Sequence, residues 1–508
     1  MIGAIIALAL MGVLVAIVAG RSSVRSGPRP GDRSERDQSP RWARLRDVRD
    51  LVIDEDRLAD RAVLGWLEGK LLAMPPLQSV LVLAPSGMGK TARYVVPTVL
   101  RWSGAALVTS VKGDAVALTI DHRREQGPVW VFDPTGTSGI PSCRWSPLAS
   151  ANTYGGALRA AAWLTDSSRV EKATSNEQAM WDTLGEQLIA PLLFAARREG
   201  LGMEAVADWV LFRQEEEVAE ILEQIGDRDA LAHWSSIRAS EGRTKASIFV
   251  TAQRILHVFA HPDVRDALHP VSGEEPFDPD ALLTTGGTLY VVAPAEEQEL
   301  FTPVFETLVN AVVRAAERRS AAVGGLPISP RLLLMLEEAA NCAPLRRLPS
   351  IASAGRGQGI QLVSVWQDEG QIETIFPASR ARTVWANHTA KITLPGVSDH
   401  RTLESMSNLV GDDSFRRTTE SRGADRGQSE STSWHSERLA PPQYIRELEE
   451  GMALAVVGNR KPMRLETRAW FEDDRLRARV APKIAASYDA AFAPAAIGGR
   501  QRRPRARR

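Results

Sequence analysis

One stretch of the sequence has the residue types and the spacing of a phosphate-binding loop. Residues 84–91 read Ala-Pro-Ser-Gly-Met-Gly-Lys-Thr, which fits the Walker A pattern except that alanine occupies the first glycine position. Glycine at 87 and 89 would let backbone N–H groups curl around a phosphate without a Cβ in the way. The predicted binding residues are Ser86, Gly87, Met88, Gly89, Lys90 and Thr91.

The last two residues of this loop are suited to a magnesium-bound nucleoside triphosphate. The Lys90 ammonium would reach the β and γ phosphates, and the Thr91 hydroxyl would bind Mg²⁺. An apolar run, Ser79–Ala84, precedes the loop and a helical pattern follows it. This context predicts a strand, a loop and a helix N-terminus, which adds positive potential where the phosphates bind. The expected cofactors are therefore ATP and Mg²⁺.

A site of this kind also needs a carboxylate on a neighbouring strand. Residues 331–338 read Arg-Leu-Leu-Leu-Met-Leu-Glu-Glu, an apolar strand that ends in two acids. Ligands bind at the carboxyl ends of such strands. We therefore expect Glu337 to hold Mg²⁺ through water and Glu338 to polarise the attacking water. The alternative is a pair of solvated acids at a helix N-terminus, where acids are favoured.

Two more polar residues are candidates for the same chemistry. Arg356 lies between Gly355 and Gly357, which predicts an exposed, flexible loop. Gln367 follows the predicted strand IQLVSV at 360–365 and Trp366, and its side chain could face the γ phosphate from the end of this buried strand. A solvent-facing loop arginine and a polar cap at the end of a strand are the alternative interpretations.

Short apolar and β-branched runs alternate with helical patterns and must position these residues. Several runs are apolar at consecutive positions, which is typical of parallel strands covered on both faces. The sequence therefore predicts a doubly wound α/β fold. The predicted strands are Ser79–Ala84, Ala105–Ser110, Val129–Asp133, Thr288–Ala293, Leu332–Leu336, Gln361–Val365 and Ala390–Leu394.

Residues 152–280 interrupt this alternation with helical periodicity, which predicts an all-α domain inserted between two parts of the α/β domain. The expected helices are Glu177–Arg198, Met203–Arg213, Glu215–Ile225 and Lys245–Phe259. The full division is a membrane anchor at 1–20, a basic juxtamembrane linker at 21–50, α/β parts at 51–151 and 281–480, a mobile loop at 412–438 and a disordered basic tail at 481–508.

The N-terminal residues have the composition of a membrane anchor. Residues 2–19 are uncharged and almost wholly aliphatic, and nine arginines against four acids follow in residues 21–49. Such a run just spans the hydrocarbon core, and the following charge predicts a single-pass inner-membrane protein with its bulk in the cytoplasm. A cleaved signal peptide is the alternative. The formal net charge is zero and there are two cysteines, so bulk charge indicates no partner and no disulfide framework is expected.

In their order and spacing, several motifs together resemble the TraG/TraD-type coupling proteins of type IV secretion and conjugation, within the FtsK/HerA-like P-loop superfamily. These motifs are APSGMGKT, SVKGD at 110–114, VWVFDPTG at 129–136, the block Leu332–Gln367 and the later stretches 387–399 and 439–462. The resemblance extends over most of residues 78–470. It implies a RecA-like ATPase domain, an inserted all-α domain, a membrane anchor and a homo-hexameric ring with nucleotide at subunit interfaces.

The resemblance also implies residue roles and partners. Arg356 matches a trans arginine finger and Gln367 a sensor residue. The implied partners are DNA as a relaxase complex, type IV secretion channel components and the inner membrane. Two departures are a single predicted membrane helix, where two are common, and Glu337 in place of the usual aspartate. An FtsK-like double-stranded DNA translocase, a protein-secretion ATPase and a non-catalytic membrane scaffold remain alternatives.

Overall fold

The structure is a computed structural model that describes residues 41–58, 60–168, 176–269, 275–292, 294, 298–341, 345–422 and 428–492. The chain forms two compact units. The larger unit runs from Trp42 to Val410 and resumes at Ala440, and the smaller one contains Gly411–Leu439.

The larger unit is built on one sheet of 11 strands in the spatial order β2-β1-β13-β12-β9-β3-β8-β7-β4-β6-β5. The strands are β1 Val63–Leu67, β2 Lys70–Ala73, β3 Val80–Leu83, β4 Ala105–Ser110, β5 Val129–Phe132, β6 Thr288–Val292, β7 Leu332–Leu336, β8 Ile360–Trp366, β9 Ala390–Thr393, β12 Met452–Val457 and β13 Met463–Glu466.

Seven strands, from β9 to β5 in the spatial order, are parallel. They are the seven strands predicted from the sequence, with ends that agree within one residue. The predicted α/β class with a parallel sheet is confirmed. Side chains from β3, β7 and β8 join helices on one face in a single apolar core.

The other four strands extend the sheet in antiparallel fashion and were not predicted. β1 and β2 are joined by Glu68 and Gly69, which both have positive φ, 49° and 74°. Two such residues make a tight hairpin turn. This hairpin was hard to recognise in the sequence because Glu68 occupies the first position of the turn, where asparagine, aspartate or glycine is usual.

Helices cover the sheet and connect its strands. The helices outside the interval from β5 to β6 are α3 Val96–Arg101, α4 Asp114–Gln126, α13 Gln298–Ala322, α14 Leu348–Gln358, α15 Glu369–Ile375, α16 Ala378–Asn387, α17 His400–Val410, α18 Pro442–Arg446, α19 Asp474–Arg477 and α20 Pro482–Phe492, with short 3-10 turns at Leu45–Asp47, Glu55–Arg57 and Trp470–Glu472.

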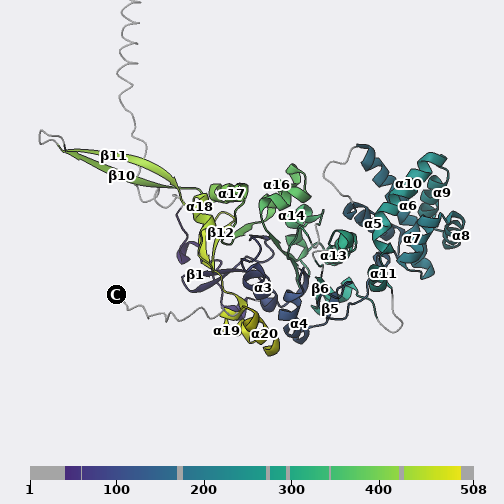
Figure 1. The fold of residues 1–508 in the computed structure, drawn as a ribbon, viewed down its shortest axis with the longest axis horizontal. Coiled ribbons are helices and arrows are strands. Elements are labelled where there is room, and N and C mark those ends of the chain that lie inside the picture. The colour runs from purple at the N-terminus through teal and green to yellow at the C-terminus, as the bar shows by residue number, and fades with distance from the viewer. Residues whose placement is uncertain are drawn as a thin grey trace, which may run out of the picture. The chain divides into compact units, whose positions relative to one another are not determined.

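The described residues between β5 and β6 contain helices and turns and no strand. Their elements are the 3-10 turn Pro147–Ser150, α5 Tyr154–Ser167, α6 Asn176–Glu199, α7 Met203–Phe212, α8 Glu215–Ile225, α9 Arg228–Arg238, α10 Gly242–Leu256, the 3-10 turn His257–Ala260, α11 Pro262–Leu268 and α12 Pro279–Thr285. Helices α7, α8, α9 and α10 all contact α6 (Figure 1). The four predicted helices are confirmed, with ends that differ by up to three residues.

Local sequence explains where these helices begin and end. The Thr153 side chain accepts from the Gly156 N–H at the start of α5, and the Asp227 carboxylate accepts from two N–H groups at the start of α9. These are favoured N-cap residues because they satisfy orphan donors. Gly226 ends α8 in the left-handed conformation, which glycine adopts without steric cost.

Three predictions about irregular segments were wrong. Within 412–438, expected to be a loop, the described residues form the antiparallel strands β10 Asp412–Arg422 and β11 Gln428–Arg438 (Figure 1). Part of the expected disordered tail is the helix α20, which packs in an apolar cluster. The end of the expected linker is folded, because Val48 is fully buried and the Ala43 N–H donates to the Pro462 carbonyl.

None of the helices among the described residues has the length and apolar character needed to cross a bilayer. The predicted anchor at 1–20, the linker up to residue 40 and the tail beyond residue 492 lie outside the described residues.

Candidate nucleotide-binding site

The glycine-rich loop follows β3 directly and leads into a helix. The Ala84 N–H donates to the Trp366 carbonyl of β8 at 2.9 Å, which fixes the start of the loop. Gly87 and Gly89 have φ of 83° and 75°. Only glycine adopts this left-handed region without steric cost. The loop therefore has the backbone freedom that phosphate binding requires.

The helix after the loop begins with a widened turn. Residues Thr91–Val95 are π-helical and continue into α3. Pro97 offers a reason, because it has no N–H for the Arg93 carbonyl and its ring would clash with that carbonyl in a regular helix. Widened turns of this kind are frequent at functional sites. All six residues of α3 are buried, so the turn rests on a rigid base.

The two acids directly follow β7, which pairs with β8 and β4. The expectation that they lie on the strand next to β3 was wrong, because β8 lies between β3 and β7. The acids nevertheless meet the loop. Lys90 Nζ contacts Glu338 Oε1, and Thr91 Oγ1 donates to Glu337 Oε1. All four side chains therefore converge at the carboxyl edge of the sheet.

Both glutamates are held in place by the strands around them. Glu337 is 4% exposed, and its backbone carbonyl accepts from Thr109 Oγ1 of β4 at 2.9 Å. A solvated acid at a helix N-terminus is therefore the wrong description of Glu337. Glu338 has φ of 49°, which is uncommon for a residue with a side chain and costs about 1–3 kcal/mol. This turn directs its carboxylate to Lys90.

The environment of Glu337 favours the neutral acid. Burial, and then the charge of Asp114, raise the pKa of Glu337 to about 7, while the hydrogen bond from Thr91 and the charge of Lys90 oppose the rise. Glu337 Oε2 is buried and has no hydrogen-bond partner among the described residues. A carboxylate and a hydroxyl oxygen are hard donors of the kind that Mg²⁺ prefers. The residues present therefore fit this ion.

Gln367 lies beside the same acids. It directly follows β8, the strand between the loop and β7, and its Nε2 is 3.4 Å from Glu338 Oε2. Its backbone N–H donates to Gln371 Oε1 at 2.8 Å. The Gln367 side chain is therefore within hydrogen-bond distance of the Glu338 carboxylate.

Arg356 is the predicted residue that its own chain does not bring to the site. It lies in the last turn of α14, so the prediction of a flexible loop was wrong. The helix forms despite its glycines because Leu348, Ile351, Ala352 and Gly355 bury one face at helical spacing. Arg356 is exposed and precedes β8, whereas Gln367 follows it. The seven residues of β8 span about 20 Å.

Sequence reasoning missed two residues next to the site. Asp114 begins α4 just beyond β4, and its charge acts on Glu337. The feature that could have identified Asp114 is an acidic residue shortly after the apolar strand 105–110. Arg93 lies two residues beyond Thr91 and is bound by the C-terminal part of the chain. The sequence gives no local sign of that partner, which lies more than 370 residues away.

The sequence pattern of the family described as "Type IV secretory system Conjugative DNA transfer" matches residues 41–491. The chain belongs to this family. It is 24% identical over 420 residues to the conjugal transfer protein TraG of Agrobacterium fabrum, which covers 79% of this chain and 61% of that protein. It is 21% identical over 410 residues to the protein VirD4 of the same organism, covering 78% and 59%. The chain thus spans about three fifths of the relatives' length.

Solved structures show the same fold. The unbound monoclinic form of the bacterial conjugative coupling protein TrwB superposes with a TM-score of 0.64 at 18% identity, covering 84% of this chain and 91% of that one. TrwB in complex with ADP and Mg²⁺ superposes with a TM-score of 0.60 at 19% identity, covering 78% and 87%. This chain therefore has the fold of TrwB.

Proposed function

We propose that this chain is an ATP hydrolase that couples DNA, as a relaxase complex, to a type IV secretion channel. The observation that carries the proposal is the meeting of Lys90 and Thr91 with Glu338 and Glu337 at one edge of the sheet. Family membership over residues 41–491 supports the conjugative role. The nucleotide complexes of TrwB support the cofactor choice.

The site residues divide the work of hydrolysis among them. Ser86, Gly87, Met88 and Gly89 surround the phosphates with backbone N–H groups, and Lys90 leaves Glu338 to neutralise the β and γ phosphates. Thr91 and Glu337 would hold Mg²⁺, which would stabilise negative charge on the phosphate oxygens. Glu338, released from Lys90, accepts a proton from the attacking water. Gln367, which bonds Glu338 and directly follows β8, would shift with Glu338 and so couple the state of the nucleotide to that strand.

The remaining parts of the proposal concern assembly. Arg356 is exposed and is separated from its own site by the length of β8, so we propose that it serves the site of a neighbouring copy in a hexameric ring. The helices of residues 152–280 are proposed as an all-α domain that receives the DNA–relaxase cargo. The predicted segment 1–20 is proposed to anchor the chain in the inner membrane.

ATP turnover by the full chain, with and without DNA, tests the enzymatic part. We expect turnover that DNA stimulates. Lys90→Ala should abolish turnover, because the phosphates lose their main cation. Lys70→Ala is the matched control, since Lys70 is an exposed residue of the β1–β2 hairpin, and should behave as the wild type.

Each outcome separates one alternative. No turnover by the wild type would support a membrane scaffold. Equal turnover with and without DNA would favour a protein cargo. Turnover that survives in Lys90→Ala would remove the glycine-rich loop from the site and end the proposal.

A further inference from the structure

A buried network of hydrogen bonds connects the end of β8 to the residue that leads into β9. Trp366 Nε1 donates to Ser364 Oγ at 2.9 Å, and Ser364 Oγ lies 2.9 Å from His388 Nε2. His388 Nδ1 lies 2.7 Å from the Val384 carbonyl of α16. Trp366, Ser364 and His388 are each at most 1% exposed. Polar groups buried so deeply are costly unless each has a partner.

The direction of each hydrogen bond follows from the chemistry of the groups at the two ends of the network. The Val384 carbonyl can only accept, so His388 Nδ1 carries a proton. Burial lowers the pKa of His388 to about 4, so the ring is neutral at neutral pH and its Nε2 accepts. The Ser364 hydroxyl therefore donates to Nε2, and its oxygen accepts from the indole N–H of Trp366. One arrangement of protons thus satisfies every group in the network.

This network crosses the strand that carries the phosphate loop. β3 lies between β8 and β9, and Leu81 of β3 is in register with Ser364 on one side and with Lys391 on the other. Lys391 Nζ donates to the His388 carbonyl at 2.8 Å, which fixes the histidine to β9. The bond between Ser364 and His388 therefore joins the two strands that flank β3.

The end of β8 that the network anchors contacts three parts of the nucleotide site. The Trp366 carbonyl accepts from the Ala84 N–H at 2.9 Å, at the start of the phosphate loop. The preceding carbonyl of β8 accepts from the Ala339 N–H at 3.1 Å, directly after the two acids. Gln367, the next residue, lies 3.4 Å from Glu338. A displacement of Trp366 would therefore move all three contacts together.

We propose that Ser364, Trp366 and His388 are positioning residues that hold the end of β8 in place against the phosphate loop and the two acids. The three side chains act through Gln367 and through the two backbone contacts. The network favours one geometry, because breaking any member leaves a buried polar group unpaired. Misplacing catalytic groups by about 1 Å can cost about 10²-fold in rate. This inference rests on the proposed nucleotide hydrolysis and names what holds its site in place.

Steady-state ATP turnover by variants of the full chain tests the inference. Ser364→Ala removes the central hydroxyl, so kcat should fall by about 10²-fold. The KM for ATP should stay unchanged, because the residues that bind the phosphates remain. His388→Leu should act in the same way. His388→Gln should recover most of the turnover, because its amide oxygen can accept from the Ser364 hydroxyl.

Thr119→Val is the matched control for lost stability. Thr119 lies on α4, and its buried hydroxyl oxygen lies 2.6 Å from the hydroxyl of Tyr290 on β6. This variant also leaves a buried partner unpaired, so its urea midpoint should fall as that of Ser364→Ala does. Its kcat should stay at the wild-type value, because the end of β8 keeps its anchor.

Nitrogen-15 NMR of the histidines gives a readout that does not depend on turnover. The His388 signal is identified by its loss in His388→Gln. It should be that of a neutral ring with the proton on Nδ1. It should also stay unchanged between about pH 6 and pH 8, where an ordinary histidine titrates.

Four results would overturn the positioning role and leave the proposed function intact. The first is a wild-type kcat in Ser364→Ala and His388→Leu, and the second is a His388→Gln variant as slow as His388→Leu. The third is an equal loss of kcat in Thr119→Val. The fourth is a His388 ring that titrates in this pH range or carries its proton on Nε2. If the wild type hydrolysed no ATP, the proposed function itself would fail, and the positioning role with it.

Discussion

Two adjacent glutamates occupy different environments because the backbone turns sharply between them. Glu337 directly follows its strand and is buried. Burial and then the charge of Asp114 raise the pKa of its carboxyl, whereas the hydrogen bond from Thr91 lowers it. Glu338 turns out of the strand with positive φ and meets Lys90. Environment therefore separates a residue suited to an ion from one suited to a water molecule, although the two side chains are identical.

Glu338→Gln tests this division. The amide cannot accept a proton from the attacking water, so turnover should fall by about 10²–10⁴. Nucleotide binding should persist or strengthen, because Lys90 loses its carboxylate partner and is free for the phosphates. Steady-state turnover and calorimetric ATP affinity measure the two effects. A variant with normal turnover would assign the proton acceptor to another group.

Glu306 allows a separate prediction on stability and pH. It lies fully buried on α13, where burial raises the pKa of its carboxyl to about 8, Asp166 adds to the rise, and the Arg346 N–H and charge oppose it. The folded state thus keeps a proton that the unfolded state releases near its ordinary pKa of 4.5. The stability contributed by this carboxyl is therefore complete below pH 4.5 and is lost as pH rises through 8.

Glu306→Gln should remove this dependence. Between pH 6 and pH 9 the variant should gain stability relative to the wild type, by on the order of a few kcal/mol. Urea unfolding midpoints at each pH measure the difference. Glu199→Gln, at the exposed end of α6, is the control and should follow the wild type. Parallel pH curves for the wild type and Glu306→Gln would contradict the assignment.

Among the elements, the sequence predicted those that a local pattern of apolar residues specifies. Buried parallel strands are apolar along their length, so all seven were recognisable, and with them the ends that carry Lys90, Glu337 and Gln367. The antiparallel strands β12 and β13 pair with each other, and they join the sheet through β9 and β1, which are distant in sequence. The hairpin of β10 and β11 is polar and therefore resembled a loop. Arg356 was predicted to lie in a loop because the neighbouring glycines obscured the apolar face of helix α14.

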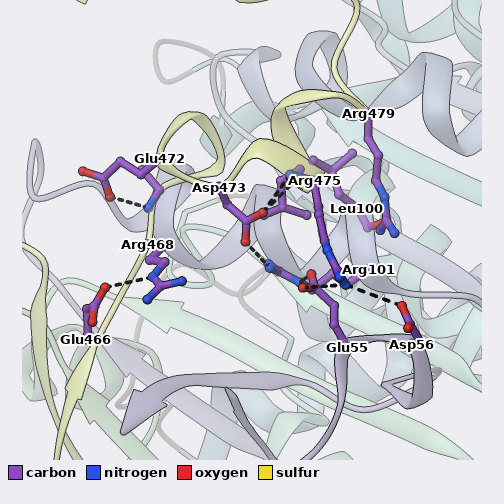
Figure 2. Close-up of polar contacts among 12 residues, drawn as sticks. Glu55, Asp56, Leu100, Arg101, Glu466, Arg468, Glu472, Asp473, Arg475 and Arg479 are labelled. Atoms are coloured by element: carbon purple, nitrogen blue, oxygen red, sulfur yellow. Dashed lines mark hydrogen bonds and ion pairs between the residues drawn. The ribbon is translucent and has the colours of Figure 1, made fainter. Parts of the chain in front are cut away.

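The C-terminal segment is an element whose role only the fold reveals. Trp470, Leu476 and Ala485 pack with Val96 and Leu100 of the helix that follows the phosphate loop. At the end of that helix, Arg101 Nη2 donates to Asp473 at 2.6 Å and Nε to Glu55 at 2.8 Å (Figure 2). Segments more than 400 residues apart thus support one helix, and with it the widened turn that begins at Thr91.

Trp470→Ala should therefore destabilise the larger unit. Trp470 is fully buried and packs against Phe471 and Tyr488 with ring centroids 5.6 and 5.1 Å apart. Removing such a side chain costs about 3–5 kcal/mol. The urea midpoint measures the loss, and Phe471→Ala, which truncates a partly buried ring, should cost less. An equal loss for both variants would mean that the segment does not pack through Trp470.

At the scale of the whole molecule, the two edges of the sheet have complementary properties. The carboxyl edge gathers Lys90, Thr91 and the two acids. The opposite edge presents Arg356 at the end of α14, close to Ile328, whose N–H donates to the Gln358 carbonyl at 3.2 Å. The exposed apolar residues Val323 and Leu326 belong to the same connection between α13 and β7. An arginine on this edge can serve a nucleotide only if a second copy supplies it.

Mixing two inactive variants tests that arrangement. Arg356→Ala keeps its own nucleotide loop but supplies no arginine to a neighbour, and an arginine finger contributes about 10³–10⁵ in rate, so turnover should be lost while ATP binding persists. Lys90→Ala has no functional loop but retains Arg356.

Where a Lys90→Ala subunit adjoins an Arg356→Ala subunit, one complete site forms, so a mixture should recover turnover that neither variant has alone. The Lys90→Ala/Arg356→Ala double variant, mixed with either single variant, completes no site. With Lys90→Ala it should recover nothing, because neither subunit has a loop, and with Arg356→Ala it should also recover nothing, because neither has the arginine. Turnover by Arg356→Ala alone at the wild-type rate, or no recovery in the mixture of the two single variants, would show that the catalytic arginine is not Arg356.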